Sequence, residues 1–395
     1  MKKPRVLYVS GDVRTGGGGR GVSTLILEAL AREFDLTHLC TVPPDVPAVD
    51  AWFDSNLSGL TWKTVRPSAC ERWLVRRIPG EGAFHEVNYL LRCAKRIAPE
   101  FDVTFACCDM EADIGAPGIQ YLHYPYFGDR PWRRWLPGDA GPLRLAGALL
   151  AGRTDPWMVI SGYDVERSRR NLTLTNSHWT ARRISALLDI ESTVVYPPAL
   201  GRFPEVAWET RADGFVSIGQ LERGKRFDWI IDTMARVHRQ WPAVQLHLCC
   251  HQDPRWVEAE IVDLVERKVR EANGWVHLHW NLSRVALGEL LSRNRYGIHA
   301  KLEEHFGMAP AEIASSGALP FVHDSGGQVE IVGHDPRLCF DTPADAATKI
   351  LDVMRKPALQ DELRAQVSTR AAQFAPKTFQ NQIVEQVHGF LERKS

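Results

Sequence analysis

The sequence lacks the features that define a disulfide-stapled, zinc-binding or membrane-spanning protein. Its eight cysteines occur as adjacent pairs or single residues, and it contains no C-x-x-C motif, so no disulfide framework or zinc site is indicated. The longest mildly apolar stretch, residues 143–151, is far shorter than the roughly 20 residues of a membrane-spanning helix. We therefore expect a soluble, cytoplasmic protein with reduced, mostly buried thiols.

A net charge of one sign is also missing, because 48 Lys and Arg residues balance 48 Asp and Glu residues. No overall field attracts a polyanion, and nucleic acid is therefore not an expected partner. The 395 residues are 44% hydrophobic and 24% charged, which is an ordinary globular composition. At roughly 150 residues per domain, the length predicts two domains, each with its own core.

Strand and helix patterns alternate along both halves of the chain. In the first half, a predicted strand over residues 5–10, a glycine-rich loop and a helix precede a strand over residues 34–42, which together make one βαβ unit. Two adjacent prolines between Val194 and Gly201 interrupt the pattern. We therefore predict an α/β fold of two doubly wound, Rossmann-like domains that face each other across a cleft.

The predicted boundaries follow from this interruption. An N-terminal domain covers residues 1–197 and a C-terminal domain residues 198–376, while a last helix in residues 377–395 is expected to return to the N-terminal domain. The strands predicted in the C-terminal domain cover residues 214–219, 244–250, 275–280, 296–300, 319–323 and 338–340. The region from residue 45 to about residue 79 shows no clear pattern.

The glycine-rich loop lies between the first predicted strand and the first predicted helix. Gly16, Gly18 and Gly21 satisfy the G-x-G-x-x-G fingerprint of dinucleotide-binding proteins, but no acidic residue clearly ends the next strand. Val22-Ser23 stands where a P-loop needs Lys-Ser, so an ATPase is not indicated. The loop could bring its backbone close to a ligand at a helix N-terminus; the alternative is a flexible surface loop.

Two acidic residues, Glu304 and Glu312, flank the start of a predicted helix. About one such pair is expected by chance in a chain of this size, so the context carries the argument. A carboxylate can accept hydrogen bonds from both vicinal hydroxyls of a sugar or ribose. The amides of Phe306, Gly307 and Met308, at the helix N-terminus, could hold a phosphate. The alternative is a solvated helix start with two surface acids.

Basic residues and a histidine also follow predicted strands. Arg223, Lys225 and Arg226 come after the strand over residues 214–219, where a diphosphate could bind, although a solvated turn has the same composition. His123 ends a strand of the first half. Ligands of doubly wound sheets bind at such strand ends, but a lone histidine is as often structural.

Two stretches, residues 72–77 and 130–136, combine Trp with Arg. This combination suits a membrane interface or a polyanion, and an ordinary cleft rim is the alternative. We expect peripheral contact with the inner face of a membrane as one use of these stretches. The acidic pair in Asp109-Met-Glu111 has no supporting context, so no metal site is predicted.

In this order, the features resemble the retaining GT-B glycosyltransferases of family 4, over nearly the whole chain. The resemblance rests on the glycine loop, His123, Lys225, the pair Glu304 and Glu312, and Ser325-Gly-Gly327. Within the family, the sequence is most similar to the mannosyltransferases that extend lipid-linked oligosaccharides, of the asparagine-linked glycosylation 11 type. The motifs that suggest it are Tyr121-Leu-His-Tyr-Pro125, Asn176-Ser-His-Trp-Thr180, Val195-Tyr-Pro-Pro198, Ser217-Ile-Gly-Gln220, Glu304-His-Phe-Gly307 and His323-Asp-Ser-Gly-Gly327.

The resemblance implies a metal-independent hexosyltransferase that uses a nucleotide sugar and no other cofactor. GDP-mannose is the first choice of donor and a UDP-hexose the alternative; the acceptor would be a glycan, a lipid-linked glycan or a small-molecule hydroxyl. It further implies that Glu312 holds the ribose, that Lys225 with Arg223 neutralises the diphosphate, and that Glu304 and the amides of the helix start orient the hexose.

In the N-terminal domain, the resemblance implies that His123 contacts the sugar near the reacting carbon and that Gly18 and Gly19 contact the donor. Gln220 stands where most family members have Arg, so Arg223 or Arg226 would have to supply the second positive charge. Three alternatives to a transferase remain: an epimerase or phosphorylase of the same fold, a non-catalytic sugar-nucleotide-binding partner subunit, and an NAD-dependent enzyme that rests on the glycine loop alone.

Overall fold

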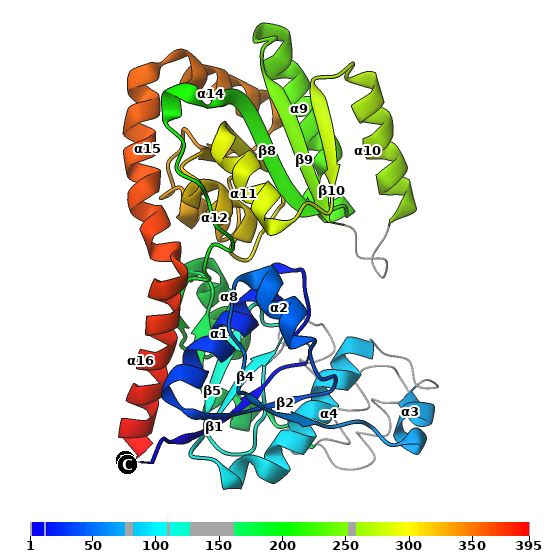
Figure 1. The fold of residues 1–395 in the computed structure, drawn as a ribbon, viewed down its shortest axis with the longest axis vertical. Coiled ribbons are helices and arrows are strands. Elements are labelled where there is room, and N and C mark those ends of the chain that lie inside the picture. Colours follow the sequence, from blue (N-terminus) through cyan, green and yellow to red (C-terminus); the bar gives the residue numbers. More distant parts are fainter. Residues whose placement is uncertain are drawn as a thin grey trace. The chain divides into compact units, whose positions relative to one another are not determined.

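The structure is a computed structural model that describes residues 2–11, 13–75, 82–108, 111–126, 162–251 and 258–394. The chain divides into two compact units, Met1–Val195 with Gln380–Ser395, and Tyr196–Phe379. The predicted boundary at residues 197 and 198 lies close to this division. Each unit contains one parallel sheet with helices on both faces (Figure 1), so the prediction of a two-domain α/β fold is confirmed.

The first unit has a parallel sheet with the strand order β3-β2-β1-β4-β5-β6-β7. Its strands are β1 (Arg5–Val9), β2 (Asp35–Cys40), β3 (Thr61–Thr64), β4 (Val103–Cys108), β5 (Ile119–Leu122), β6 (Leu172–Thr175) and β7 (Thr193–Val194). Its helices are α1 (Gly18–Glu33), α2 (Val46–Phe53), α3 (Ala69–Val75), α4 (Gly82–Ile97), α7 (Val165–Arg169) and α8 (His178–Leu188). The apolar face of α4 packs on β1, β2 and β4 through Leu90, Leu91 and Ala94.

The second unit repeats this arrangement with the strand order β10-β9-β8-β11-β12-β13. Its strands are β8 (Ala212–Gln220), β9 (Gln245–His251), β10 (Val276–Trp280), β11 (Asn294–His299), β12 (Leu319–His323) and β13 (Cys339–Phe340). Its helices are α9 (Phe227–Gln240), α10 (Ala259–Glu271), α11 (Arg284–Arg293), α12 (Met308–Ser315), α13 (Gln328–Ile331), α14 (Pro343–Arg355) and α15 (Pro357–Ala371).

Two hydrophobic clusters cover the two faces of this second sheet. Ile230 of α9 and Ile350 of α14 pack with Leu246 of β9 on one face, whereas Leu287 of α11 packs with Val216 of β8 on the other. Side chains alternate between the faces along each strand, so a central parallel strand such as β8 is apolar on both sides. All strands predicted for this half are present, with ends that differ by at most two residues.

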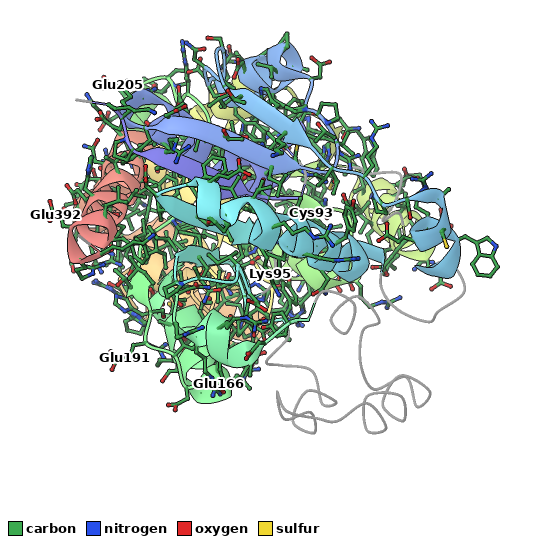
Figure 2. The ribbon with its side chains drawn as sticks, turned by 90° about the horizontal axis from the view of Figure 1, so that it is seen from below. Cys93, Lys95, Glu166, Glu191, Glu205 and Glu392 are labelled. Carbon is green, nitrogen blue, oxygen red and sulfur yellow. The ribbon has the colours of Figure 1, made fainter. Side chains whose placement is uncertain are left out.

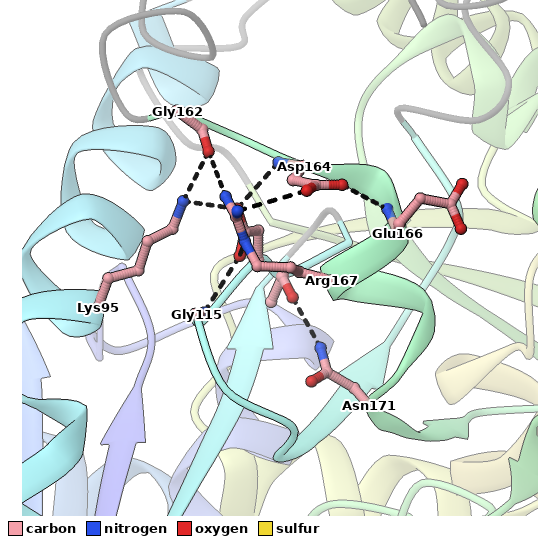
Figure 3. Close-up of polar contacts among 9 residues, drawn as sticks. Lys95, Gly115, Gly162, Asp164, Glu166, Arg167 and Asn171 are labelled. Atoms are coloured by element: carbon pink, nitrogen blue, oxygen red, sulfur yellow. Dashed lines mark hydrogen bonds and ion pairs between the residues drawn. The ribbon is translucent and has the colours of Figure 1, made fainter. Parts of the chain in front are cut away.

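A buried ionic cluster fixes the connection that leads into β5. Asp113 has no exposed surface; its carboxylate accepts hydrogen bonds from Nε and Nη2 of Arg167, at 2.9 and 2.7 Å, and from Nζ of Lys95, at 2.5 Å (Figure 3). Burial would raise the pKa of Asp113, but these cations hold it below its usual range. Figure 2 shows Lys95 on α4, whereas Glu166 of α7 points outward.

The last helix, α16 (Pro376–Lys394), begins in the second unit and continues in the first. Nε2 of Gln380 donates to the Glu28 carboxylate of α1 at 2.6 Å, and Nζ of Lys394 donates to the carbonyl of Asp102 at 2.7 Å. Both contacts lie within the first unit. The helix starts one residue before the predicted range, because Pro376 is a favourable first-turn residue.

The region from residue 45 to residue 79, in which no pattern was found, contains α2, β3 and α3 among the residues that the structure describes. β3 is a four-residue edge strand without a buried position, so it carries no alternation that the sequence could show. α2 is a short helix that Asp45 caps and that has Pro47 in its first turn, and both residues also suit a loop.

Candidate functional site

Two segments of the second unit that carry predicted site residues leave neighbouring strands. The turn with Lys225 follows β8, and the loop with Glu304 follows β11. β8 and β11 pair in the middle of the sheet, where the strand order reverses direction. Ligands of doubly wound sheets bind at the carboxyl ends of the strands at this switch point. The topology therefore brings Lys225 and Glu304 to the place where a ligand is expected.

Lys225 and Glu304 are in direct contact. Nζ of Lys225 lies 2.8 Å from Oε2 of Glu304, and the two side chains are 18% and 12% exposed. Nζ of Lys301 lies 3.2 Å from the other carboxylate oxygen, Oε1. Nε2 of His299, the last residue of β11, lies 3.1 Å from Oε2. One nearly buried carboxylate thus has three nitrogen donors.

These donors determine the protonation of Glu304. Burial alone would raise its pKa, but Lys225, the hydrogen bond from His299 and Lys301 hold the pKa well below the usual range. Burial in turn lowers the pKa of His299, so its ring is neutral near pH 7. An ionised carboxylate only accepts hydrogen bonds, so Nε2 of His299 carries the proton. Sequence reasoning missed His299 and Lys301, although Lys301 stands only three residues before Glu304.

Gly219 and Gly326 make room for the Lys225 side chain and for the backbone of the Glu304 loop, respectively. A Cβ on Gly219 would lie 3.2 Å from Cγ of Lys225, so the lysine side chain passes over a position without a side chain. A Cβ on Gly326 would lie 2.3 Å from the carbonyl oxygen of Glu304, and the φ of Gly326 is +75°. The amide of Gly327 donates to that same carbonyl at 2.7 Å. The Ser325-Gly-Gly327 motif therefore holds the Glu304 loop in place.

Glu312 lies on α12 and is paired with an arginine that the sequence did not indicate. Nη2 of Arg284, in the first turn of α11, lies 2.8 Å from Oε1 of Glu312. The same nitrogen donates to the carbonyl of Leu200. Burial raises the pKa of Glu312, and Arg284 only partly offsets this effect. Glu312, the residue predicted to hold the ribose, is thus part of a buried ion pair. Arg284 binds one of its two carboxylate oxygens.

The residues between the two acids divide into core and backbone positions. Phe306 is 3% exposed, and its ring packs against Tyr196 and Phe374, at 5.8 and 5.5 Å between centroids. Its side chain is therefore part of the core, so that only its backbone could contact a donor. Gly307 has a φ of +108° and precedes α12, which begins at Met308. The first-turn amides of α12 are thus the groups that could bind an anion.

The basic residues around Gln220 have different surroundings. Gln220 ends β8 and is half-buried. The Arg223 side chain is 69% exposed and lies 3.8 and 3.7 Å from the carboxylates of Glu258 and Glu260. Arg226 donates to the carbonyl of Ala300, next to Lys301, at 3.4 Å. Arg226 therefore lies nearer to the Glu304 loop than Arg223, whose charge acidic side chains already balance.

In the first unit, the structure brings His123 and the glycine loop together. β1 ends before this loop, and α1 begins at Gly18 after Gly16 and Gly17, which have φ values of +81° and +79°. A Cβ on Gly19 would lie 3.6 Å from Nε2 of His123. The same nitrogen lies 3.8 Å from Sγ of Cys107. The imidazole thus contacts the first turn of α1, at the carboxyl end of the sheet.

The motifs around His123 also have a structural explanation. The carbonyl of His123 accepts a hydrogen bond from Nδ2 of Asn176 at 2.9 Å. Ser177 caps α8 by accepting from the amide of Thr180 at 3.0 Å. The hydroxyl of Tyr121 donates to the carbonyl of Val195 at 2.8 Å. These bonds fix the end of β5 and with it the backbone at His123.

Of the two basic-aromatic stretches, only the first lies partly within the described residues. The stretch over residues 130–136 lies outside them. Trp73 on α3 is 55% exposed. No helix within the described ranges is long and apolar enough to cross a membrane. In the same ranges, no group of three or more His, Cys, Asp or Glu side chains is arranged to hold a metal ion.

The fold and the site define the class of protein. Two doubly wound units, each with a Rossmann-like strand order, make up the GT-B fold of glycosyltransferases. Residues 202–374 match the family model of the glycosyl transferases group 1. The matched region contains Lys225, Glu304 and Glu312.

Curated relatives support the same assignment. The chain is 24% identical over 244 residues to the GDP-Man:Man(3)GlcNAc(2)-PP-Dol alpha-1,2-mannosyltransferase of Dictyostelium discoideum, covering 57% of this chain and 48% of that protein. It is 25% identical over 229 residues to the protein of the same name from Mus musculus, covering 52% and 46%. The chain thus spans about half the length of these relatives. The predicted resemblance to mannosyltransferases is confirmed.

Solved structures share the fold over the whole chain. A sucrose-phosphate synthase from Thermosynechococcus elongatus has a TM-score of 0.69 at 16% identity and covers 100% of both chains. Anabaena HepE, determined in complex with UDP and glucose, has a TM-score of 0.64 at 14% identity and covers 98% of this chain and 99% of its own. At these identities, the likeness concerns the fold alone.

Proposed function

We propose that this chain transfers a hexose from a nucleotide sugar to a hydroxyl acceptor with retention of anomeric configuration. The contact of Lys225 with Glu304 at the switch point of the second unit, inside the matched glycosyltransferase domain, carries the proposal. Mannose from GDP-mannose is the first choice, because the names of the curated relatives specify it. A UDP-hexose is the alternative donor.

The second unit would bind the donor. Lys225 would neutralise the diphosphate, and a fixed positive charge there stabilises the leaving group as its negative charge develops. Glu304 would accept hydrogen bonds from hydroxyls of the hexose, and Glu312 from hydroxyls of the ribose. The first-turn amides of α12 offer further donors for the phosphates. No step of this scheme needs a metal ion, so we propose transfer that persists in EDTA.

The first unit would contribute the acceptor-side groups. His123 and the glycines of the first turn of α1, Gly18 and Gly19, lie together at the carboxyl end of that sheet. Glycines allow a close approach of a ligand to the backbone. We propose that His123 positions the reacting groups, a role that depends on geometry more than on charge. Loss of transfer in His123→Ala with unchanged nucleotide affinity would support this assignment.

An amphiphilic acceptor at a membrane surface is part of the proposal. The names of the curated relatives specify a dolichol-linked glycan acceptor, and Trp73 is an exposed aromatic side chain next to Arg72. Tryptophan beside arginine suits a membrane interface. Co-sedimentation with anionic liposomes should occur at low salt, and should weaken at raised salt and in Trp73→Ala. Absence of binding at low salt would remove the membrane from the proposal.

The donor is tested by calorimetric titration of GDP-mannose, UDP-glucose, UDP-N-acetylglucosamine and the free nucleotides, with EDTA present. We expect one base to bind and Lys225→Gln to weaken its affinity, because a charge on the diphosphate is lost. Absence of binding across the panel would contradict the proposal. Binding of a nucleotide sugar without transfer to any acceptor pool would favour the non-catalytic subunit. Conversion of the nucleotide sugar in the absence of an acceptor would favour an epimerase.

A further inference from the structure

Glu304 is paired with two ammonium groups, one more than a single carboxylate needs for charge balance. Nζ of Lys225 lies 2.8 Å from Oε2, and Nζ of Lys301 lies 3.2 Å from Oε1. All three side chains are largely buried, at 12% exposed for Glu304, 18% for Lys225 and 26% for Lys301. A carboxylate this buried needs a counter-charge at all times, because a buried charge without a partner is costly.

Under the proposed function, Lys225 also binds the diphosphate of the donor. A diphosphate carries at least two negative charges and competes with a single carboxylate for the same ammonium group. When Lys225 turns to the diphosphate, its interaction with Oε2 of Glu304 weakens. Glu304 then loses a counter-charge when it has to be ionised and oriented for the hexose.

His299 cannot supply the missing charge. Its Nε2 donates a hydrogen bond to Oε2 of Glu304 at 3.1 Å. Because burial lowers the pKa of His299, the ring is neutral near pH 7. It therefore orients the carboxylate but does not compensate its charge.

Lys301 is placed to remain with Glu304. It lies three residues earlier on the same loop, whereas Lys225 lies on the turn that follows β8. The carbonyl of Lys301 accepts a hydrogen bond from Nε2 of Gln328 at 2.7 Å, and the carbonyl of Glu304 accepts one from the amide of Gly327 at 2.7 Å. These contacts fix the loop without any contribution from Lys225.

We propose that Lys301 is a positioning residue that becomes the principal counter-ion of Glu304 when Lys225 binds the diphosphate of the donor. This inference rests on the proposed function. Among the described residues, the charged or titratable groups that face the Glu304 carboxylate are Lys225 from the turn after β8, His299 from β11 and Lys301 from the same loop. Lys301 thus keeps the charge of the site balanced through the reaction.

The first test measures the ionisation of Glu304 in the ligand-free protein by carboxyl ¹³C NMR, with the signal assigned by its loss in Glu304→Gln. Lys225→Gln imitates the departure of Lys225. We expect Glu304 to stay ionised in this variant near pH 6, and its pKa to rise strongly only in Lys225→Gln with Lys301→Gln. Lys268→Gln is the matched control, since Lys268 is 21% exposed and pairs with Asp232 instead. The same pKa in Lys225→Gln as in the double variant would overturn the inference.

The second test measures turnover of whichever donor binds. We expect Lys301→Gln to lower kcat about tenfold and to move the acidic limb of the kcat profile to higher pH, because each unit of pKa corresponds to a factor of ten. Lys301→Arg should restore both, and affinity for the free nucleoside diphosphate should not change. A loss of nucleotide affinity equal to that of Lys225→Gln would overturn the inference, because Lys301 would then bind the phosphate. If the wild type binds no nucleotide sugar, the proposed function fails, while the NMR result still decides the pairing of Glu304.

Discussion

Glu304 and Glu312 belong to the same segment of the second unit, but their surroundings have opposite effects. Glu304 has two lysines and a histidine around it, and its pKa lies well below the usual range. Glu312 is more deeply buried, has one arginine, and its pKa is raised by burial. The carboxylate whose pKa is lowered lies in the loop at the switch point, and the one whose pKa is raised lies on the helix that follows. Burial and counter-ions together therefore decide which acid stays charged.

The largest effect is expected from Glu304→Gln. The substitution keeps the size of the side chain but removes the charge that both lysines compensate. We expect kcat to fall by about 100-fold to 1000-fold, which is the range for one electrostatic contact in an active site, while the free nucleotide still binds. Glu303→Gln is the control, since Glu303 is exposed and adjacent. Equal activity of the two variants would contradict the role of Glu304.

Gly326→Ala should displace the Glu304 loop. A Cβ at this position would lie 2.3 Å from the carbonyl oxygen of Glu304, and a displacement of the loop by a fraction of an ångström lowers kcat by about tenfold to 100-fold. Gly274→Ala is the matched control, because Gly274 also has a positive φ, +95°, but no atom within 4 Å of the added Cβ. Both variants should lose about 1 kcal/mol of stability from backbone strain, and Gly326→Ala should lose more, because its Cβ also collides with the backbone of Glu304. Only Gly326→Ala should lose activity.

Arg284→Gln should distinguish the role of Glu312 in donor binding from the role of Glu304 in turnover. Without the guanidinium at 2.8 Å, the already raised pKa of Glu312 rises further. As the pH falls, Glu312 is then protonated, and its contact with the ribose lost, at a higher pH than in the wild type. We expect the donor KM to increase about tenfold near pH 6 with little change in kcat, and Arg284→Lys to restore part of the affinity. Arg293→Gln on the same helix, with its side chain 71% exposed, should leave KM unchanged. A change in kcat alone would contradict this role.

The smallest effect is the pH dependence of the free energy of unfolding. Between its lowered folded pKa and its unfolded pKa, Glu304 is protonated only in the unfolded state, so its contribution to stability is lost as the pH falls. Glu312 has a raised folded pKa, so in its window the folded state binds the proton and stability increases as the pH falls. Each slope is at most about 1.4 kcal/mol per pH unit.

Urea titrations from about pH 7 down to about pH 3 would measure these slopes, because the window of Glu304 lies below the unfolded pKa of about 4.3 and that of Glu312 lies above it. The stability difference between wild type and Glu304→Gln should decrease with falling pH, and that between wild type and Glu312→Gln should increase. Slopes of the same sign would show that the two carboxylates do not differ as the structure indicates.

Much of the second unit could be predicted because its periodic patterns are strong. The strand predicted at residues 319–323 is β12, and the strand predicted at residues 214–219 lies within β8. Local patterns also indicated Lys225, Glu304 and Glu312, because these residues follow strands or begin a helix. β3 was missed because it has no buried face. Arg284 was missed because its pairing with Glu312 depends on the packing of α11 against α12, which no local pattern encodes.

The central claim is that Glu304 serves transfer from a nucleotide sugar. The most direct measurement is release of GDP from GDP-mannose in EDTA, with and without an acceptor pool, for wild type, Glu304→Gln and Glu303→Gln. We predict release by wild type and Glu303→Gln, stimulated by acceptor, and almost none by Glu304→Gln. Release that persists in Glu304→Gln, or that depends on a metal ion, would contradict the account.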